Sequence, residues 1–254
     1  MNRIDSPSND KLKTLRKLKD KKYRERYKKL LLEGIVPVTE VLETGYIEEI
    51  FIDEDRAEAL LDEFSEERAA ITLLSPRAFS SLVSTESDQG VVAVAKHFLR
   101  DAEALPKRGR FLYADGVSDP GNLGGMIRSA EAFFFDGVLI GPNCVDPAND
   151  KSLRASMASA FRIPIAKIDD AALFRLAKEC PIYTLDIRGD MLTPYFEAKD
   201  DFILAVGNEA HGIREEISRA AEHRIRIPIR DSIDSLNANV AASVAMFALQ
   251  GGRS

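Results

Sequence analysis

The chain has 254 residues, 45% of them hydrophobic, which is enough for one large domain or two ordinary ones with packed cores. No apolar run approaches the roughly eighteen residues of a membrane span, and the N-terminal MNRIDSPSND lacks the apolar stretch of a secretory signal. Two distant cysteines and three histidines show no spacing typical of a metal site or a disulfide framework. We therefore expect a cytoplasmic protein that holds no metal and crosses no membrane.

Charge is distributed unevenly along the chain. The net charge of −6 argues against a nucleic-acid-binding protein, but residues 1–32 contain twelve Lys or Arg and only four acidic residues. This segment carries +8, while the remaining 23 basic and 37 acidic residues give −14. Such asymmetry suggests a basic arm that meets a polyanion, although a solvated helical face explains a charge run equally well.

Residues 1–100 are expected to form a small α/β domain. Leucines and tyrosines at spacings of three and four predict one or two basic helices over residues 8–32. Strand and helix patterns then alternate, in the order helix 39–45, strand 46–53, acidic helix 54–68, strand 70–74, helix 75–83 and strand 90–98. Ser75 and Pro76 suit the N-cap and first position of a helix. The charged residues 101–110 are interpreted as a linker.

Residues 111–254 are expected to form a doubly wound α/β domain with five or six mostly parallel strands. Strands are predicted at 111–115, 137–140, 162–168, 181–187, 201–207 and 223–229. Helices are predicted at 123–135, 151–161, 169–179 and 213–221, with a last helix that ends near residue 250. The apolar residues of that last segment follow a helical period and are expected to be buried: Leu236, Val240, Val244, Phe247 and Ala248.

Three loops that follow strands are rich in small and polar residues: DGVSDPGNLGG (115–125), GNEAHG (207–212) and IPIRDSIDSLN (227–237). Ligands of open α/β sheets bind at such loops, where glycine lets the backbone approach closely. The chain contains no G-x-x-x-x-G-K-[ST], no G-x-G-x-x-G and no G-x-S-x-G. A P-loop NTPase, a Rossmann-type cofactor site and a nucleophile elbow are therefore unlikely candidates for these loops.

Each polar residue of the loops also has a purely structural interpretation. Asn122 could cap the helix that follows it, and Arg128 could be a surface arginine. Glu209 could be a first-turn acid favoured by the helix dipole. Ser235 could cap the last helix, with Asn237 in its first turn. Taken singly these interpretations are the better ones, but the order and spacing of the residues together are more specific.

The series N-x-G-x-x-x-R (122–128), GNEAHG, and I-P-I followed by S-L-N resembles the three motifs of the SpoU/TrmH class of the SPOUT superfamily, which are RNA ribose 2′-O-methyltransferases. The resemblance covers about residues 111–249. The basic start, LLLEG (30–34), TEVLETG (39–45) and GVVAVA (90–95) resemble the substrate-binding domain of ribosomal-RNA members, whose fold is similar to small RNA-binding ribosomal proteins. The chain departs from the family's pattern at Phe134 and Ala158, where many members have glycine.

The resemblance implies a C-terminal trefoil knot, an exception to the rarity of knots in proteins. It also implies S-adenosylmethionine as the cofactor and a homodimer in which each active site is completed across the interface. Cofactor-binding residues would act largely through backbone groups, at Val206, Gly207, Asn208, Ile227 and Leu236. RNA contacts are expected from basic side chains: Lys11, Lys13, Arg16, Lys17, Lys21, Lys22 and Arg154.

The resemblance further implies catalytic roles for five residues: Asn122, Arg128, Glu209, Ser235 and Asn237. Arginine is a poor base, so we expect Arg128 to bind phosphate and support a developing alkoxide. Asn122 would orient Arg128 and the ribose, and Glu209 would hold Arg128 or its loop. Ser235 and Asn237 would position ribose and cofactor, so that positioning carries most of the rate.

We therefore expect an enzyme that methylates a ribose 2′-hydroxyl of RNA, with 23S rRNA as the favoured substrate. One alternative is a non-catalytic RNA-binding or ribosome-assembly protein, which would be expected to have lost some of Asn122, Arg128, Glu209 and Asn237. A second alternative is the same chemistry on tRNA. The N-terminal domain favours rRNA, because tRNA members of the family often lack it.

Overall fold

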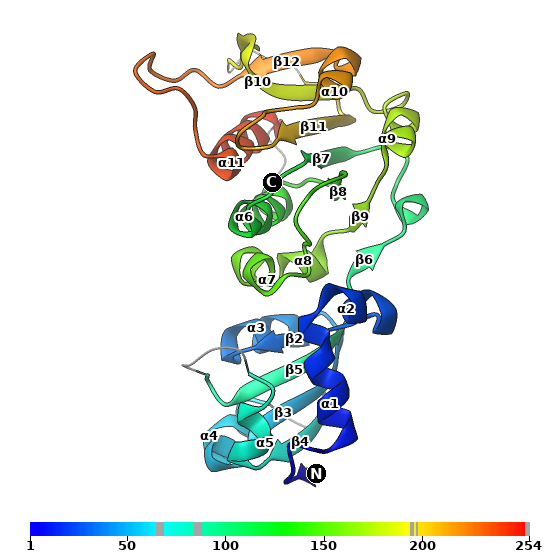
Figure 1. Ribbon diagram of the computed structural model, residues 1–254. Helices are drawn as coiled ribbons and strands as arrows, with labels where there is room; N and C mark the ends of the chain where they lie inside the picture. Colours follow the sequence, from blue (N-terminus) through cyan, green and yellow to red (C-terminus); the bar gives the residue numbers. More distant parts are fainter. Residues whose placement is uncertain (65–68, 84–87, 194–195, 197, 252–254) are drawn as a thin grey trace. The chain divides into compact units, whose positions relative to one another are not determined.

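The computed structural model describes residues 1–64, 69–83, 88–193, 196 and 198–251. Contacts divide the chain into two compact units, Met1–Phe98 and Leu99–Ser254. Each unit has its own β-sheet with helices packed against it (Figure 1). Within the described ranges, no helix has the length and apolar character that crossing a bilayer requires.

The first unit contains a five-stranded mixed sheet. Its order is β1 (Asn2–Ile4), β4 (Ala70–Leu74), β3 (Ile47–Asp53), β5 (Val91–Lys96) and β2 (Lys29–Glu33). β1, β4 and β3 run parallel, and β5 is antiparallel to β3 and β2. The helical segments are α1 (Asp10–Arg16), η1 (Lys17–Lys19), α2 (Lys21–Tyr27), α3 (Ile35–Leu42), η2 (Glu54–Arg56), α4 (Ala57–Leu60) and α5 (Pro76–Ser80).

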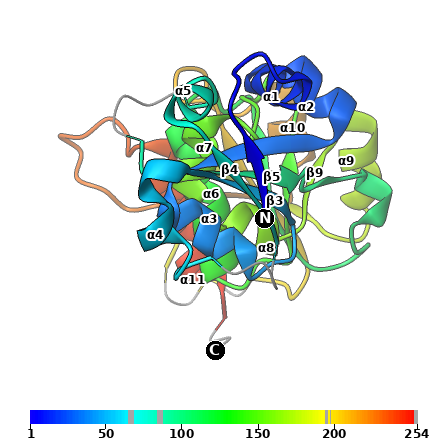
Figure 2. The ribbon, with the colours of Figure 1, turned by 90° about the horizontal axis from the view of Figure 1, so that it is seen from below.

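The core of the first unit lies between the sheet and the helices α1 and α5. Leu12 and Leu15 of α1 pack with Phe51 of β3 and Phe79 of α5. Figure 2 shows α1, α2 and α5 on one side of this sheet and α3 and α4 on the other. Ser75 caps α5 as predicted, because its hydroxyl accepts a hydrogen bond from the Ala78 amide at 3.3 Å. The expected small α/β domain is confirmed.

The prediction of helix over residues 8–32 is wrong at its end. Residues 29–33 form β2, in which Leu30 and Leu32 are buried while their neighbours are half-exposed. Three consecutive leucines satisfy both a helical and a strand pattern, and pairing with β5 decides between them. β1 was not predicted. The expected helix 54–68 is divided into η2 and α4, and its last residues, 65–68, lie outside the described ranges.

The second unit contains a seven-stranded sheet in which every pairing is parallel. Its order is β12 (His223–Arg226), β10 (Ile182–Met191), β11 (Phe202–Gly207), β7 (Arg110–Asp115), β8 (Gly137–Ile140), β9 (Ile165–Lys167) and β6 (Leu99–Arg100). The predicted parallel α/β domain is confirmed. The sheet has one strand more than the six predicted, because β6, which was not predicted, pairs with β9 at the edge.

The helices of the second unit cover both faces of its sheet (Figure 1). They are η3 (Ala102–Ala104), α6 (Pro120–Ala132), α7 (Asp150–Ser156), α8 (Ser159–Arg162), α9 (Asp170–Leu176), α10 (Glu215–Ala220) and α11 (Ala238–Leu249). Leu173 of α9 and Ile217 of α10 pack against Phe111 and Ile203 of the sheet. Leu105, from the segment expected as a linker, belongs to the same core. The trefoil knot stays a prediction.

The prediction for the face of α11 that is buried is wrong. The buried residues are Ala242, Ala245, Met246 and Leu249, whereas Val240, Val244 and Phe247 are 46%, 41% and 60% exposed. Leu236 is half-buried and Ala248 is exposed. Close packing on α6 explains the difference: a Cβ at Gly125 would clash with Asn239, and the hydroxyls of Ser129 and Ser243 are 2.7 Å apart. Small residues therefore face α6, and the large apolar ones face outward on this chain.

Candidate active site

A cavity of about 720 Å³ lies at the carboxyl ends of β11 and β12 and beside the middle of β10. Its walls come from three segments, 185–188, 206–213 and 226–241. All five residues expected to bind the cofactor line it: Val206, Gly207, Asn208, Ile227 and Leu236. Glu209, Ser235 and Asn237 line it as well. The second and third loops thus meet at one cavity, while the cofactor-binding role of each residue stays a prediction.

The loop after β11 is shaped by Gly207, Asn208 and Gly212. A Cβ at Gly207 would clash with the backbone of Gly212, whose φ of +71° favours glycine. Asn208 and Gly212 exchange two backbone hydrogen bonds of 3.0 and 2.8 Å. The Asn208 side chain accepts from the Ala210 amide at 2.9 Å and donates to the Gly116 carbonyl at 2.8 Å. Asn208 therefore fixes this loop and ties it to the first loop.

Four polar side chains from the three loops meet beside the cavity, and we call Ser118, Asn122, Glu209 and Asn237 the amide cluster. The Asn122 Nδ2 donates to Glu209 Oε1 at 2.9 Å, and the Asn122 Oδ1 accepts from Asn237 Nδ2 at 2.9 Å. The Ser118 hydroxyl donates to Glu209 Oε2 at 3.2 Å. One chain of hydrogen bonds therefore runs from Ser118 to Asn237, and its directly bonded residues are up to 115 positions apart in the sequence.

Two capping interpretations of these residues are wrong. Asp119, rather than Asn122, caps α6, because its carboxylate accepts from the Asn122 amide at 2.8 Å. Asn237, rather than Ser235, caps α11, with its Oδ1 accepting from the amides of Asn239 and Val240 at 3.0 and 3.2 Å. The side chain of Asn122 is thereby left for the amide cluster. Asn237 combines both tasks, since its oxygen caps the helix and its nitrogen contacts Asn122.

The carboxylate of Glu209 orients the amide cluster. Burial raises the pKa of Glu209, but hydrogen bonds from Asn122 and Ser118 outweigh it and hold this pKa below its usual value. An ionised carboxylate only accepts, so it fixes the Asn122 amide with its nitrogen toward Glu209 and its oxygen toward Asn237. Each amide nitrogen carries two hydrogens. Asn122 and Asn237 therefore each keep one N–H for a ligand.

Arg128 lies apart from the amide cluster. It is exposed on α6, and its side chain has no hydrogen bond or ion pair with any residue that the structure describes. Six residues separate it from Asn122, which is about 9 Å along a helix axis. Glu209 accordingly contacts Asn122 and Ser118 instead of Arg128. Ser235 lies at the cavity wall and is exposed. Of the five expected catalytic residues, the structure therefore joins three by hydrogen bonds: Asn122, Glu209 and Asn237.

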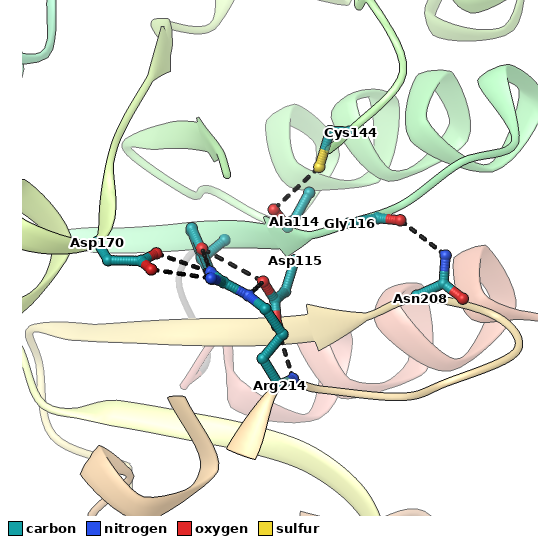
Figure 3. A network of polar contacts seen from close by, with 8 residues as sticks. Ala114, Asp115, Gly116, Cys144, Asp170, Asn208 and Arg214 are labelled. Atoms are coloured by element: carbon teal, nitrogen blue, oxygen red, sulfur yellow. Dashed lines mark hydrogen bonds and ion pairs between the residues drawn. The ribbon is translucent and has the colours of Figure 1, made fainter. Parts of the chain in front are cut away.

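A second polar network, which we call the arginine network, consists of Tyr113, Asp115, Asp170 and Arg214. Figure 3 shows Arg214 between Asp115 and Asp170. Arg214 donates to Asp115 through its amide at 2.8 Å and its Nε at 2.7 Å. It makes two bonds of 2.8 and 2.7 Å to Asp170, and one of 2.9 Å to the Tyr113 hydroxyl. The Asp115 side chain is 0% exposed. The first loop, which begins after Asp115, is thus fixed to the end of the second.

Electrostatics in the arginine network follow from its hydrogen bonds and burial. The hydrogen bond to Asp170 and the contacts with Asp115 raise the pKa of Arg214 despite partial burial. The hydrogen bond from Arg214 is the main cause of the lowered pKa of Asp170. Burial, reinforced by Asp115, raises the pKa of Tyr113. Sequence reasoning missed this network, because 99 residues separate Asp115 from Arg214 and no motif spacing links them.

The two departures from the family's pattern have different consequences. Phe134 follows α6 with a φ of +60°, a conformation that costs energy for a bulky residue and not for glycine. Ala158 is buried with a φ of −78°, which any residue adopts, so the change there involves space alone. Arg154, expected to bind RNA, is exposed on α7 and paired with Asp150 at 2.6 Å.

Among the residues that the structure describes, no group of three or more His, Cys, Asp or Glu side chains could hold a metal ion. Cys144 and Cys180 are both free. Burial raises the pKa of both thiols.

Comparisons with known proteins agree with this geometry. The model of the SpoU rRNA Methylase family matches residues 109–247, and that of the MRM3-like substrate binding domain matches residues 9–93. The chain is 33% identical to the Bacillus subtilis (strain 168) 23S rRNA (guanosine(2553)-2′-O)-methyltransferase RlmP, over 99% of this chain and 100% of that protein. It is 28% identical to the Streptomyces viridochromogenes 23S rRNA (uridine(2479)-2′-O)-methyltransferase, over 88% of this chain and 83% of that protein.

Solved structures give the same result. The AdoMet-bound rRNA methyltransferase from Sinorhizobium meliloti aligns with a TM-score of 0.83 at 25% identity, over 97% of this chain and 96% of that chain. The SpoU methyltransferase AviRb from Streptomyces viridochromogenes, in complex with AdoMet, aligns with a TM-score of 0.80 at 25% identity, over 96% and 97%. Because one family model covers more than half of the sequence and a 33% identical relative is matched over its whole length, the chain belongs to the SpoU rRNA methylase family of RNA methyltransferases.

Proposed function

We propose that this chain transfers a methyl group from S-adenosylmethionine to a ribose 2′-hydroxyl of RNA, and that its substrate is 23S rRNA. One observation carries the proposal: Glu209 and Asn237 line the cavity, and both hydrogen-bond Asn122. A molecule in the cavity would therefore lie next to free N–H groups suited to a ribose. Two relatives named as 23S rRNA 2′-O-methyltransferases support the choice of substrate.

The residues of the cavity fit S-adenosylmethionine. A volume of about 720 Å³ is within the range of small-molecule sites. Ile213, Ile227, Ile229 and Leu236 offer apolar surface for a base, and the tight loop 207–212 offers backbone groups close to the ligand. The two neighbouring solved structures with AdoMet support this choice of cofactor. When bound, the cofactor would supply a methyl group on a positively charged sulfur, and the ribose oxygen would attack the carbon of that methyl group.

The amide cluster would position the ribose, and Arg128 would act on charge. The free N–H groups of Asn122 and Asn237 can donate to ribose oxygens and hold the 2′-hydroxyl in line with the methyl group. A guanidinium would stabilise the oxygen as it loses its proton, and would bind the adjacent phosphate. Arg128 makes no hydrogen bond or ion pair with the amide cluster of its own chain. We therefore assign this role to Arg128 from a second copy of the chain.

A homodimer through α6 and α11 would bring that second Arg128 to the site. Val240, Val244 and Phe247 form an exposed apolar stripe on α11, and Phe133 extends it, since its ring lies 5.7 Å from that of Phe247. Exposed patches of this kind mark protein interfaces. Arg128 is exposed on α6 and precedes Ser129, whose hydroxyl lies 2.7 Å from that of Ser243 on α11. A second copy, covering the stripe, fits both the apolar surface and the isolated arginine.

The test of the reaction is methyl transfer from S-adenosylmethionine to 23S rRNA transcripts by the purified chain. A 2′-O-methyl group protects the following phosphodiester from alkaline hydrolysis, so a single protected position in 23S rRNA is expected. Methylation of a base, with no protected position, would refute ribose chemistry. A protected position in tRNA and none in rRNA would replace the proposed substrate. RNA binding without any transfer would favour a non-catalytic role.

The test of the dimer is the mass of the chain in solution by light scattering. Phe247→Asp is expected to give a monomer without methyl transfer. Val36→Asp is the matched control, because Val36 is 50% exposed on α3 of the first unit. A second experiment mixes two variants that both keep Phe247, one with Arg128→Ala and one with Asn122→Ala. If each site uses residues of both copies, the mixture should recover part of the activity. A fully active monomer would overturn the shared site.

A further inference from the structure

The basic N-terminal segment divides into two parts that differ in what their cations contact. In the first part, which is α1, the basic side chains contact carboxylates or other polar groups of the same chain. Lys11 pairs with Glu49 at 2.6 Å, and Lys13 pairs with Asp10 at 2.8 Å. Arg16 donates to the Pro7 carbonyl at 3.0 Å and to Ser81 Oγ at 2.9 Å. These three side chains, all expected to bind RNA, therefore already contact groups of the first unit.

The second part covers η1 and α2, and it differs from the first in five of its cations. The side chains of five exposed residues make no hydrogen bond or ion pair with the described part of the chain: Lys17, Lys21, Lys22, Arg26 and Lys28. Asp20 caps α2, and its carboxylate accepts from the Lys22 amide at 2.9 Å. Residues 17–28 contain seven basic and two acidic residues, so this short stretch keeps a charge of +5.

Two tyrosines lie among these cations. The rings of Tyr23 and Tyr27 are stacked, with centroids 6.0 Å apart and an angle of 18° between their planes. The ammonium groups of Lys17 and Lys22 lie 5.7 and 6.0 Å from the Tyr23 centroid, and the guanidinium of Arg26 lies 5.7 Å from that of Tyr27. Both rings are half-buried. Aromatic faces and unneutralised positive charge therefore occupy one surface.

We propose that this surface, formed by Lys17, Lys21, Lys22, Tyr23, Arg26, Tyr27 and Lys28, binds an unpaired stretch of the RNA substrate. We call it the α2 surface. Its cations contact phosphates, and its tyrosines stack with one or two unpaired bases. The inference rests on the proposed function for the nature of the substrate. It replaces Lys11, Lys13 and Arg16 as RNA contacts and adds Arg26, Lys28 and the two tyrosines.

The combination of groups favours unpaired RNA over other polyanions. A duplex exposes phosphates but keeps its base faces stacked inside, so its phosphates would contact the lysines while no base would stack on the tyrosines. An acidic protein would do the same. An unpaired strand offers both phosphates and base faces, and proteins that bind single strands combine a positive surface with aromatic rings. Lys22 and Arg26, four residues apart in α2, lie in neighbouring positions on successive turns of the helix.

The first experiment compares two triple variants of the full chain that remove the same charge. One removes unpaired cations, Lys17→Gln/Lys21→Gln/Lys22→Gln. The other removes paired cations, Lys11→Gln/Lys13→Gln/Lys29→Gln, in which Lys29 pairs with Glu48 at 2.5 Å. Affinity for a labelled unpaired RNA oligonucleotide is measured by anisotropy over a range of salt concentrations, without cofactor. Circular dichroism confirms that both variants are folded.

Each phosphate contact on a single strand contributes about 0.7 to the slope of log affinity against log salt. The first variant is expected to lose about 2 from that slope, and the second to keep the slope of the wild type. Equal losses in the two variants would mean that overall charge, and no particular surface, attracts the RNA. A slope unchanged in the first variant would overturn the α2 surface directly.

The second experiment tests stacking while charge is kept constant. Tyr23→Leu should weaken binding of the unpaired oligonucleotide about tenfold to a hundredfold, and Tyr23→Phe should restore most of it, because every base can stack on either ring. Binding of a duplex of the same length should be unaffected by either change. Equal losses for oligonucleotide and duplex would refute stacking.

The two experiments measure RNA binding by the α2 surface, so their results do not depend on whether the chain transfers a methyl group. If RNA binds through the α2 surface but no ribose is methylated, the inference holds and the proposed function fails. If 23S rRNA is methylated with the same KM for RNA in the wild type and the Lys17→Gln/Lys21→Gln/Lys22→Gln variant, the proposed function holds and the inference fails.

Discussion

The loop from Gly207 to Arg214 is held by two polar networks that differ in burial and in spare hydrogen-bonding capacity. At one end the arginine network encloses an Asp115 carboxylate that is 0% exposed. Beside the cavity the amide cluster joins half-buried Asn122 to the exposed residues Glu209 and Asn237. Both networks connect the first loop to the second, so each could position the site.

The difference lies in what remains for a ligand. Nε and both terminal nitrogens of Arg214 are already bonded to Tyr113, Asp115 and Asp170. A buried network whose groups are paired in this way fixes geometry and has little left to offer a substrate. The amide cluster keeps N–H groups at the edge of a cavity. We infer that the arginine network fixes the geometry of the site and that the amide cluster contacts the substrate. Substitutions of Arg214, Glu209, Asn237 and Asp170 test that division.

The largest effect on stability is expected from Arg214→Ala. This change leaves the buried Asp115 carboxylate without its main partner, and breaking a buried pair costs about 3 to 5 kcal/mol. Arg214 itself is 33% exposed, so the lower end, about 3 kcal/mol, is expected in the free energy of unfolding. Urea unfolding measures it. Binding of S-adenosylhomocysteine should fall as well, since the loop that lines the cavity loses its attachment.

Arg214→Lys separates charge from geometry in the same network. Lysine keeps the positive charge but lacks the planar fork that contacts two carboxylates and a hydroxyl. It should recover only part of the lost stability. A lysine variant as stable as the wild type would mean that charge alone matters. An alanine variant destabilised by less than about 1 kcal/mol would contradict the architectural role, since surface pairs contribute that much.

The second effect is expected on activity, from Glu209→Gln. The amide cannot accept from both Asn122 and Ser118, so Asn122 loses its fixed orientation. Misplacement of a substrate-positioning group costs on the order of a hundredfold in rate. Single-turnover methyl transfer to 23S rRNA measures it, and the free energy of unfolding should stay within about 0.5 kcal/mol of the wild type.

Glu215→Gln is the matched control for Glu209→Gln. Glu215 is an exposed glutamate six residues away that forms an ion pair with Arg219 on α10. Its replacement should leave the rate unchanged. A similar loss of rate in both variants would show that the amide cluster has no special part in the reaction.

Much of the site could be predicted from the sequence because its residues lie in three recognisable motifs. The motifs led to Asn122, Glu209 and Asn237, which the fold brings together. They could not show that Arg128 lies apart from these three residues in this chain, because a motif gives the spacing of residues along a helix and not the contacts of their side chains. The Asp115–Arg214 pair is set by strand order alone, in which β11 lies next to β7.

The fold was predictable where one pattern excludes the others. Buried strands such as β7 and β11 have continuous apolar runs, and Ser75 with Pro76 marks the start of α5. Prediction failed where a pattern is ambiguous. The leucines of β2 fit a helix equally well, and α11 has apolar residues on every side. The face of α11 that is buried depends on its packing against α6, where Asn239 lies against Gly125 and Ser243 against Ser129, and periodicity along α11 cannot reveal that partner.

A smaller effect is expected at Asn237, which belongs to the amide cluster and also caps α11. Asn237→Ala should cost about 1 kcal/mol in the free energy of unfolding, the usual contribution of a helix cap, and should reduce activity. Asn237→Asp keeps an oxygen for the amides of Asn239 and Val240 but removes the Nδ2 that donates to Asn122. It should therefore be nearly as stable as the wild type and lose activity. An active, stable aspartate variant would limit Asn237 to capping.

The smallest effect is expected from Asp170→Asn, which tests the outer half of the arginine network. The hydrogen bond from Arg214 lowers the pKa of Asp170 in the folded chain, so its contribution to stability is present above the unfolded value of about 4 and is lost as pH falls through the folded value. Because the Asp170 side chain is 40% exposed, this contribution should be below about 1 kcal/mol at neutral pH. The difference in urea midpoint between wild type and variant should therefore shrink as pH falls from about 5 towards about 3, that is, through and below the unfolded pKa of about 4. A difference that stays constant with pH would mean that Asp170 stabilises the chain by something other than its charge, and the arginine network would then depend on Asp115 alone.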